Sequence, residues 1–314
     1  MANHPSSAPA PQSLPTNWRR WVLGARPRTL PAAVAPVLVG TAAAAGVAVA
    51  GGPKGLVVWR FLCALGVAVF VQIATNYAND YSDGKRGTDD PGARVGPPRL
   101  VGNGLATPGQ VKRAMLVCFG LTALCGVPLV LFVDPKLVFV GLAAIGAGWF
   151  YTGGSRPYGY AGFGEVFVFV FFGLVATVGS FYVQTLSVTW LPVVSGAAMG
   201  CLSTALLVVN NLRDIPGDTE VAKHTLAVRL GDTRTRVLFV VLVVLPFVML
   251  PFMAGLGGRP VAALAYVALV LARRPIVDVL SGARGPKLIR VLGDTGRVQL
   301  VFGVLVAVGF YLGG

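Results

Sequence analysis

Two segments of the chain place amide, carboxylate and basic side chains at regular spacing: NYANDYSDGKRGTDD (residues 76–90) and NNLRDIPGDTEVAKHTL (residues 210–226). The spaced oxygen-bearing residues are Asn76, Asp80 and Asp83 in the first segment and Asn210, Asp214 and Asp218 in the second. These offsets place each set on one narrow face of an α-helix. Carboxylates held so close repel one another unless a cation binds. The two faces therefore predict cations bound between them.

Oxygen ligands narrow the choice of cation. The chain has only two histidines, His4 and His224, and its four cysteines form no metal-binding pattern. Carboxylate and amide oxygens favour Mg²⁺ or Mn²⁺, and Mg²⁺ usually binds one or two carboxylates together with substrate phosphate. Basic residues that could stabilise a departing diphosphate lie nearby, and they are Lys85, Arg86, Arg156, Arg213 and Lys223. One such Asp alone would indicate only a helix cap, but two matched faces predict Mg²⁺-dependent handling of a diphosphate.

The elements that position these residues are long apolar segments. The 314 residues are 55% hydrophobic and only 12% charged, which is typical of a membrane protein. A membrane-spanning helix needs about 20 largely apolar residues, or fewer when it is packed in a bundle. Nine candidate spans follow, at residues 29–50, 56–80, 112–132, 136–152, 161–183, 190–212, 236–256, 260–274 and 296–312. We expect an all-α bundle in which the acidic segments begin where two spans end.

The charges predict an orientation in the membrane. With nine spans, 22 of the 26 Lys and Arg residues and 11 of the 12 acidic residues lie on one side. The positive-inside rule makes this side cytoplasmic, so the N-terminus is cytoplasmic and the C-terminus is outside. Because the net charge of +14 is explained by topology and by contact with membrane lipid, we expect no nucleic-acid partner. Residues 1–17, rich in Pro, Ser and Ala, are expected to be a disordered cytoplasmic tail.

The motifs resemble those of the UbiA superfamily of intramembrane prenyltransferases. The resemblance rests on Asn79-Asp80-x-x-Asp83 with Gly84, Arg86 and Asp89, and on Asn210-Asn211-x-Arg213-Asp214-x-x-x-Asp218. Further support comes from the stretches RPRTLPAAVAPVLVGTA (26–42) and FGEVFVFVFFG (163–173). Within the superfamily the pattern is most similar to the MenA branch, the 1,4-dihydroxy-2-naphthoate polyprenyltransferases. The first motif departs from the wider pattern, because Gly87 stands where the superfamily has its last Asp.

The resemblance implies a nine-helix bundle with a central cavity, formed by a single transmembrane domain over residues 18–314. It implies transfer of a polyprenyl group from polyprenyl diphosphate to 1,4-dihydroxy-2-naphthoate with decarboxylation, in the cytoplasmic membrane. The implied ligands of Mg²⁺, or of Mn²⁺, are Asn76, Asp80, Asp83, Asp214 and Asp218, and the four Asp residues are the catalytic set. The implied diphosphate-binding residues are Arg86, Arg156, Arg213 and Lys223.

Further residues are weaker candidates. Arg28, Tyr151 and Tyr160 could bind the acceptor, although interfacial positions explain them equally well. Glu165 could be a general base or simply an acid at a helix N-terminus. Four phenylalanines are expected mainly to face lipid or to pack against neighbouring helices and only secondarily to contact the isoprenoid chain, and they are Phe167, Phe169, Phe171 and Phe172.

Two other classes of protein are alternatives. CDP-alcohol phosphatidyltransferases also begin with Asp-x-x-Asp-Gly, as Asp80 to Gly84 do, but their second acidic pair lies on the next helix. In this chain the second acidic pair, Asp214 and Asp218, comes more than 120 residues after the first. An ion-coupled transporter would need ionisable residues near the bilayer midplane, whereas these acids lie at helix ends. Both features favour the prenyltransferase.

Overall fold

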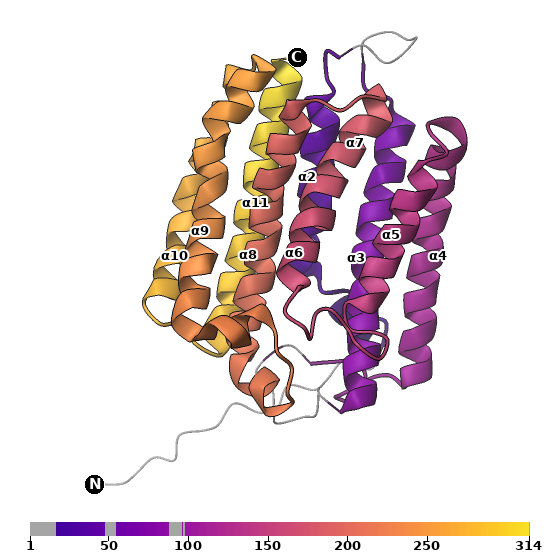
Figure 1. The fold of residues 1–314 in the computed structure, drawn as a ribbon, viewed down its shortest axis with the longest axis vertical. Helices are drawn as coiled ribbons and strands as arrows, with labels where there is room; N and C mark the ends of the chain where they lie inside the picture. The colour runs from indigo at the N-terminus through magenta and orange to yellow at the C-terminus, as the bar shows by residue number, and fades with distance from the viewer. Residues whose placement is uncertain (1–16, 48–54, 88–95, 97, 314) are drawn as a thin grey trace.

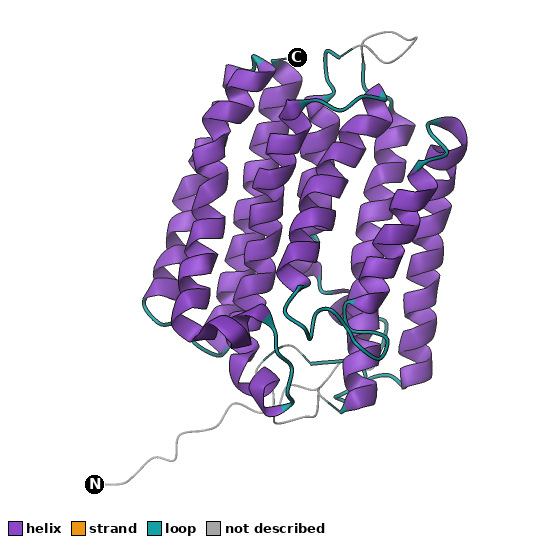
Figure 2. Ribbon diagram, viewed as in Figure 1, coloured by secondary structure: helices purple, strands orange, loops and turns teal. Residues whose placement is uncertain are grey.

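The structure is a computed structural model that describes residues 17–47, 55–87, 96 and 98–313. In this part of the chain every regular element is a helix, and the long helices run side by side in one upright bundle (Figures 1 and 2). The tail predicted over residues 1–17 lies outside the described residues apart from Asn17. The expectation of an all-α membrane protein is confirmed.

The described chain begins with short elements that turn back toward the bundle. α1 (Arg19–Ala25) ends at Arg26, whose backbone is left-handed at φ 53°, and the 3₁₀ turn η1 (Pro27–Thr29) leads into α2 (Pro31–Ala43). The Tyr77 hydroxyl donates to the Trp21 carbonyl at 2.9 Å and so fastens α1 to the bundle. The left-handed turn directs the Arg26 side chain toward the first acidic segment.

Three helices form one side of the bundle, namely α3 (Val58–Arg86), α4 (Pro108–Phe132) and α5 (Leu137–Phe150) (Figure 1). α3 extends six residues past the predicted span and therefore includes Asp83 as well as Asn76 and Asp80. α4 begins with a reciprocal capping box between Thr107 and Gln110. α5 packs against α3 and α4, and Gly148 is its only buried residue.

One continuous helical rod follows, and it changes form halfway along. α6 (Gly164–Phe169) and α7 (Ala176–Thr185) are joined by η2 (Val170–Val175), a π-helical turn. At this turn the rod comes very close to α8, because a Cβ on Gly173 would lie 2.3 Å from the Gly200 Cα. Only glycine fits at such an approach. π-Turns of this kind are often found beside functional sites.

The remaining helices are α8 (Trp190–Glu220), α9 (Leu226–Gly257), the 3₁₀ helix η3 (Pro260–Val267), α10 (Ala268–Leu280) and α11 (Pro286–Leu312). α8 is the central helix, and its residues form the main core with those of α2, α9 and α11. The last helix, α11, packs directly against α2. Arg259 fixes this closure by donating to the carbonyls of Ala42 and Ala45 near the end of α2 and of Phe310 in α11.

Six described helices are long and apolar enough to cross a membrane, namely α3, α4, the α6–α7 rod, α8, α9 and α11. α2 and α5 are apolar but shorter. The segment predicted as the eighth span begins as a 3₁₀ helix and is not among the six. The count of nine spans is therefore not confirmed. The long helices also exceed the predicted spans on the side of the acidic segments, because hydropathy detects only the lipid-embedded part of a helix.

Candidate active site

A cavity of about 600 Å³ lies inside the bundle between α2, α3, α4, α5, the α6–α7 rod and α8. Polar residues meet at one end of it, and they are Arg26, Arg28, Asn76, Asn79, Asp80, Arg99, Asn210 and Arg213. Most of the remaining lining is aliphatic or aromatic, including Val67 and Val71 of α3 and Val130 of α4. The cavity thus has a polar end and a long apolar part, which suits a ligand with a charged head and a hydrocarbon chain.

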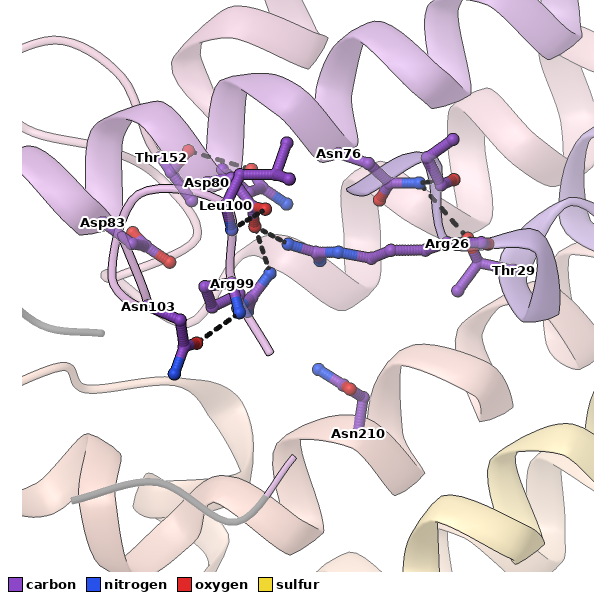
Figure 3. A network of polar contacts seen from close by, with 12 residues as sticks. Arg26, Thr29, Asn76, Asp80, Asp83, Arg99, Leu100, Asn103, Thr152 and Asn210 are labelled. Atoms are coloured by element: carbon purple, nitrogen blue, oxygen red, sulfur yellow. Dashed lines mark hydrogen bonds and ion pairs between the residues drawn. The ribbon is translucent and has the colours of Figure 1, made fainter. Parts of the chain in front are cut away.

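Asp80 is the most enclosed of the predicted metal ligands, with a side chain only 1% exposed. Its Oδ1 accepts from Arg26 Nη2 at 2.5 Å and from Arg99 Nη1 at 2.7 Å (Figure 3). Its Oδ2 accepts from the Leu100 backbone amide at 3.2 Å. Three chain segments therefore converge on one carboxylate: the α1–η1 turn, α3 and the α3–α4 connection.

The two asparagines of the first segment hold neighbouring backbone in place. Asn76 Nδ2 donates to the Ala25 carbonyl at 2.9 Å, at the turn that precedes Arg26. Asn79 Oδ1 accepts from the Thr152 hydroxyl at 2.9 Å, just after α5. Both asparagines also line the cavity, so they join its polar end to the two chain turns that border it.

A lysine joins the two acidic segments. Lys223 Nζ lies 3.7 Å from Asp83 Oδ2 and 3.8 Å from Asp218 Oδ1, and so bridges α3 and α8. Asp83 Oδ1 also accepts from the Tyr160 hydroxyl at 2.7 Å. The Tyr160 ring lies under two cations, with Lys223 Nζ 4.8 Å and the Arg86 guanidinium 5.2 Å from its centre. The predicted convergence of the two segments is therefore present for Asp83 and Asp218.

The rest of the second segment is organised by Arg213. Its guanidinium donates two hydrogen bonds of 2.7 Å to the Asp214 carboxylate and one of 2.9 Å to Asn210 Oδ1. The neighbouring Asn211 is not part of the cavity lining and donates to Glu165 Oε1 at 2.9 Å. Glu165 is buried and is not part of the cavity lining, so its position favours a structural role over that of a base in contact with substrate.

The other predicted basic residues differ in their surroundings. Arg86 donates to the carbonyls of Thr152 and Gly154, which fastens the α5–α6 connection to α3. Arg156 lies in that connection with an exposed side chain. Arg28 is also exposed but borders the cavity. Of the four predicted diphosphate-binding residues, Arg213 alone lines the cavity, and Lys223 lies between the acidic segments.

The carboxylate and amide side chains of the two segments are suitable ligands for a divalent cation. In the part of the chain that the structure describes, however, they are not gathered into a complete metal-binding site. Among the described residues, no group of three or more His, Cys, Asp or Glu side chains is close enough to hold a metal ion. Carboxylates from two helices nevertheless surround one positive charge, the Lys223 ammonium, which supports cation binding between the segments. Asp83 and Asp218 could therefore hold Mg²⁺. The five-residue ligand set remains a prediction, and Asp89 lies outside the described residues.

Aromatic side chains cover one wall of the cavity. Tyr151, Tyr158, Phe167, Phe171 and Phe172 all line it. Three of the four phenylalanines expected to face lipid or to pack against helices therefore border the cavity, whereas Phe169 packs against Gly200 of α8. Burial raises the pKa of Tyr158, so its hydroxyl stays protonated and donates to the Ala147 carbonyl at 2.8 Å. Tyr160 does not line the cavity.

Sequence reasoning did not identify the partners of Asp80. Arg99 was only one of six basic residues in its loop, and no spacing distinguished it. Arg26 belongs to the RPRTL stretch that supported the resemblance, but nothing in the sequence paired it with Asp80. Both pairings depend on how the two turns fold back over α3, and only the structure shows this.

Helices long and apolar enough to cross a membrane, around a cavity with a polar end and an apolar part, define a polytopic membrane protein whose cavity suits an amphipathic ligand. The family model for the UbiA prenyltransferase family matches residues 33–279. The chain belongs to this family, as its motifs predicted.

Curated relatives agree with this assignment. A 1,4-dihydroxy-2-naphthoate octaprenyltransferase of Mycobacterium tuberculosis is 52% identical over 93% of this chain and 96% of its own length. A protein of the same name from Escherichia coli is 40% identical over 69% of this chain and 70% of its own.

Solved structures share the fold. A UbiA homolog from Archaeoglobus fulgidus, determined with DMAPP and Mg²⁺, matches with a TM-score of 0.55 over 92% of this chain and 99% of its own, at 15% identity. A structure of digeranylgeranylglyceryl phosphate synthase matches with a TM-score of 0.59 over 94% and 98%, at 13% identity.

Proposed function

We propose that this protein transfers a polyprenyl group from polyprenyl diphosphate to 1,4-dihydroxy-2-naphthoate. The bond between C1 of the prenyl group and the diphosphate oxygen breaks, and a ring carbon of the acceptor bonds to C1. The ring carboxylate then leaves as CO₂, which gives demethylmenaquinol and free diphosphate. The observation that supports this function best is the cavity, whose cationic and amide end continues into an apolar part. The names of the relatives at 40% and 52% identity support the acceptor.

The site residues have separate roles in this proposal. Mg²⁺, or Mn²⁺ in its place, would be held by Asn76, Asp80, Asp83, Asp214 and Asp218. When bound, it would neutralise the diphosphate and assist its departure. Arg213 and Lys223 bind the diphosphate oxygens, and Arg86 and Arg156 provide further positive charge on the α5–α6 side. The apolar wall excludes water from the allylic cation that forms.

Acceptor binding involves two further residues of the cavity lining. Arg28 and Tyr151 both line the cavity, which supports a role in binding the carboxylated aromatic ring. Tyr160 acts indirectly, because its hydroxyl holds the Asp83 carboxylate. This arrangement supports Tyr160 as a positioning residue for the acidic segment.

The proposal includes a single transmembrane domain over residues 18–314 that crosses the cell membrane nine times. The crossings are the six long helices together with α2, α5 and the η3–α10 pair, and membrane lipid surrounds them. The acidic segments face the cytoplasm. The C-terminus lies at the opposite end of the bundle from the α5–α6 connection, which is consistent with a C-terminus outside the cell (Figure 1).

Turnover by the purified protein tests the function. The protein in detergent is supplied with a polyprenyl diphosphate, 1,4-dihydroxy-2-naphthoate and Mg²⁺, and both the prenylated product and CO₂ are measured. We expect both products, their loss with EDTA, and recovery with excess Mg²⁺; Mn²⁺ in a parallel sample tests the alternative metal. Product from 4-hydroxybenzoate alone would contradict the acceptor but keep the prenyltransferase. No product from either acceptor would contradict the function.

A further inference from the structure

Four aromatic rings form a continuous column along the cavity wall formed by the α5–α6 connection and the α6–α7 rod. Tyr158 and Phe167 are stacked with ring centres 3.9 Å apart and planes inclined by 21°. Phe171 continues the stack from Phe167, at 6.1 Å and 17°. Tyr151 meets Tyr158 edge-on, at 5.5 Å and 68°. All four rings line the cavity, so part of this column is in contact with whatever the cavity holds.

Backbone and side-chain contacts fix the column before any ligand binds. The Tyr158 hydroxyl donates to the Ala147 carbonyl of α5 at 2.8 Å. The backbone carbonyl of Tyr158 accepts from the Phe163 amide at 3.2 Å. The Gly159 amide donates to the Tyr151 carbonyl at 3.0 Å. Phe167 and Phe171 lie on either side of the junction between α6 and the π-turn, whose Gly173 is pressed against α8. Rings fixed in this way lose little conformational entropy when a ligand stacks on them.

The position of the column along the cavity identifies its ligand. Tyr151 lies next to the polar end, and beyond Phe172 the same rod lines the cavity with small and aliphatic residues such as Val175, Ala176 and Gly179. A flexible prenyl chain requires only an apolar wall, which the later residues provide. A nearly parallel set of rings instead matches a flat aromatic molecule, because ring pairs prefer stacked or edge-on contacts.

We propose that Phe167 and Phe171 bind the fused ring of the acceptor through the parts of their rings that border the cavity, and that they make the cavity specific for a bicyclic acceptor. This inference rests on the proposed function and adds residues that the motifs did not identify. The two side chains come from neighbouring turns of one rod and together offer a surface longer than one six-membered ring. A monocyclic acceptor would cover only part of that surface.

Steady-state kinetics of Phe167→Leu test the inference. We expect the KM for 1,4-dihydroxy-2-naphthoate to rise about five- to tenfold, while the KM for polyprenyl diphosphate and kcat stay within about twofold. Phe171→Leu is expected to change the same parameter in the same direction. Phe167→Tyr keeps a ring at the position and should restore the KM. The matched control is Phe169→Leu, because Phe169 packs on Gly200 and does not line the cavity.

Binding without turnover provides a second measurement. The naphthoate is titrated by calorimetry into wild type and Phe167→Leu in the absence of polyprenyl diphosphate, and weaker binding by the variant supports the inference. Three results for Phe167→Leu would overturn the inference while leaving the proposed function intact. They are an unchanged affinity and KM for the naphthoate, a rise in the KM for polyprenyl diphosphate alone, and a loss of kcat with an unchanged KM for the naphthoate. Wild-type protein that neither binds nor prenylates the naphthoate would overturn the proposed function and the inference together.

Discussion

At the level of single residues, the acids of the site differ in their burial and in the number of chain segments that they connect. Asp80 is 1% exposed and joins three chain segments, whereas the Asp218 side chain is 13% exposed and faces Lys223. Removing the charge of Asp80 therefore takes a carboxylate away from the buried Arg99 and the partly buried Arg26, which affects stability as well as chemistry. Asp218 is the better position for testing the chemistry alone.

Asp218→Asn is expected to lower turnover by at least about a hundredfold, because the amide cannot neutralise a cation between the two acidic segments. The thermal unfolding temperature in detergent should change little, since the Asp218 side chain is less buried than that of Asp80. Turnover and melting are measured side by side. Asp278→Asn, the same change on α10 at a 39% exposed side chain, is the control and should remain active. Near-normal turnover of the Asp218 variant would contradict a shared cation site.

Arg99→Leu is expected to reduce the free energy of unfolding by about 2 kcal/mol, because it removes a charged hydrogen bond to a buried carboxylate. Arg26 and the Leu100 amide still contact Asp80 in the variant, so the protein should fold. Denaturation in detergent measures the loss. Arg273→Leu, at an exposed position on α10, should leave stability unchanged. Equal stabilities of the two variants would show that the Asp80–Arg99 contact contributes little.

At the level of elements, the ends of the helices determine the site. α3 continues to Arg86 and α8 to Glu220, so Asp80, Asp83, Asp214 and Asp218 all lie on helices and not in loops. At the other end of the bundle, Asp134 accepts from the Lys136 amide at 2.9 Å, just before α5, and from the Tyr182 hydroxyl of α7. Asp134 thereby links the start of α5 to α7.

This link predicts a dependence on pH. The hydrogen bond from Tyr182, followed by that from the Lys136 amide, lowers the pKa of Asp134 below its ordinary value of 3.8. The link therefore stabilises the protein fully above the pKa of the unfolded chain, and this contribution is lost as the pH falls through the folded pKa. Melting curves between about pH 6 and pH 2.5 should show that wild type loses its advantage over Asp134→Asn at the acidic end. Tyr182→Phe should reduce the effect, and parallel curves would contradict it.

The sequence predicted the positions of the helices better than their local geometry. Apolar length and charge located α3, α4, the α6–α7 rod, α8, α9 and α11, because burial in lipid leaves a strong signal in composition. The 3₁₀ start at Pro260 and the π-turn at Val170 were not predictable, since both follow from packing against other helices. In the site, helical spacing predicted the acids correctly on α3 and α8. The partners Arg26 and Arg99 come from turns whose path no periodicity describes.

At the level of the whole molecule, the two ends of the bundle differ in their use of charge. At one end, Asp80 and four arginines line the cavity, and the arginines are Arg26, Arg28, Arg99 and Arg213. At the other end, Arg60 and Arg259 donate to backbone carbonyls, including those of Val183 and Phe310. These two arginines therefore support the ends of the helices.

The predicted orientation can be tested by thiol labelling. Ser281, in the α10–α11 turn, and Ser187, in the α7–α8 turn, are exposed and lie at opposite ends of the bundle. Each is changed to Cys in a variant without the four native cysteines. We expect Ser187→Cys to react with a membrane-impermeant reagent in intact cells, and Ser281→Cys to react only after permeabilisation. The reverse pattern would place the acidic segments outside the cell.

The contact between α2 and α11 has a consequence for biogenesis. The apolar helix α2, near the start of the described chain, borders α11, and Arg259 joins the ends of both through their carbonyls. A nascent chain therefore exposes one side of α2 to lipid or to the insertion machinery until α11 has been made. A chain that stops before Pro286 should be inserted in the membrane with this side of α2 uncovered, and should therefore be an early target for membrane proteases.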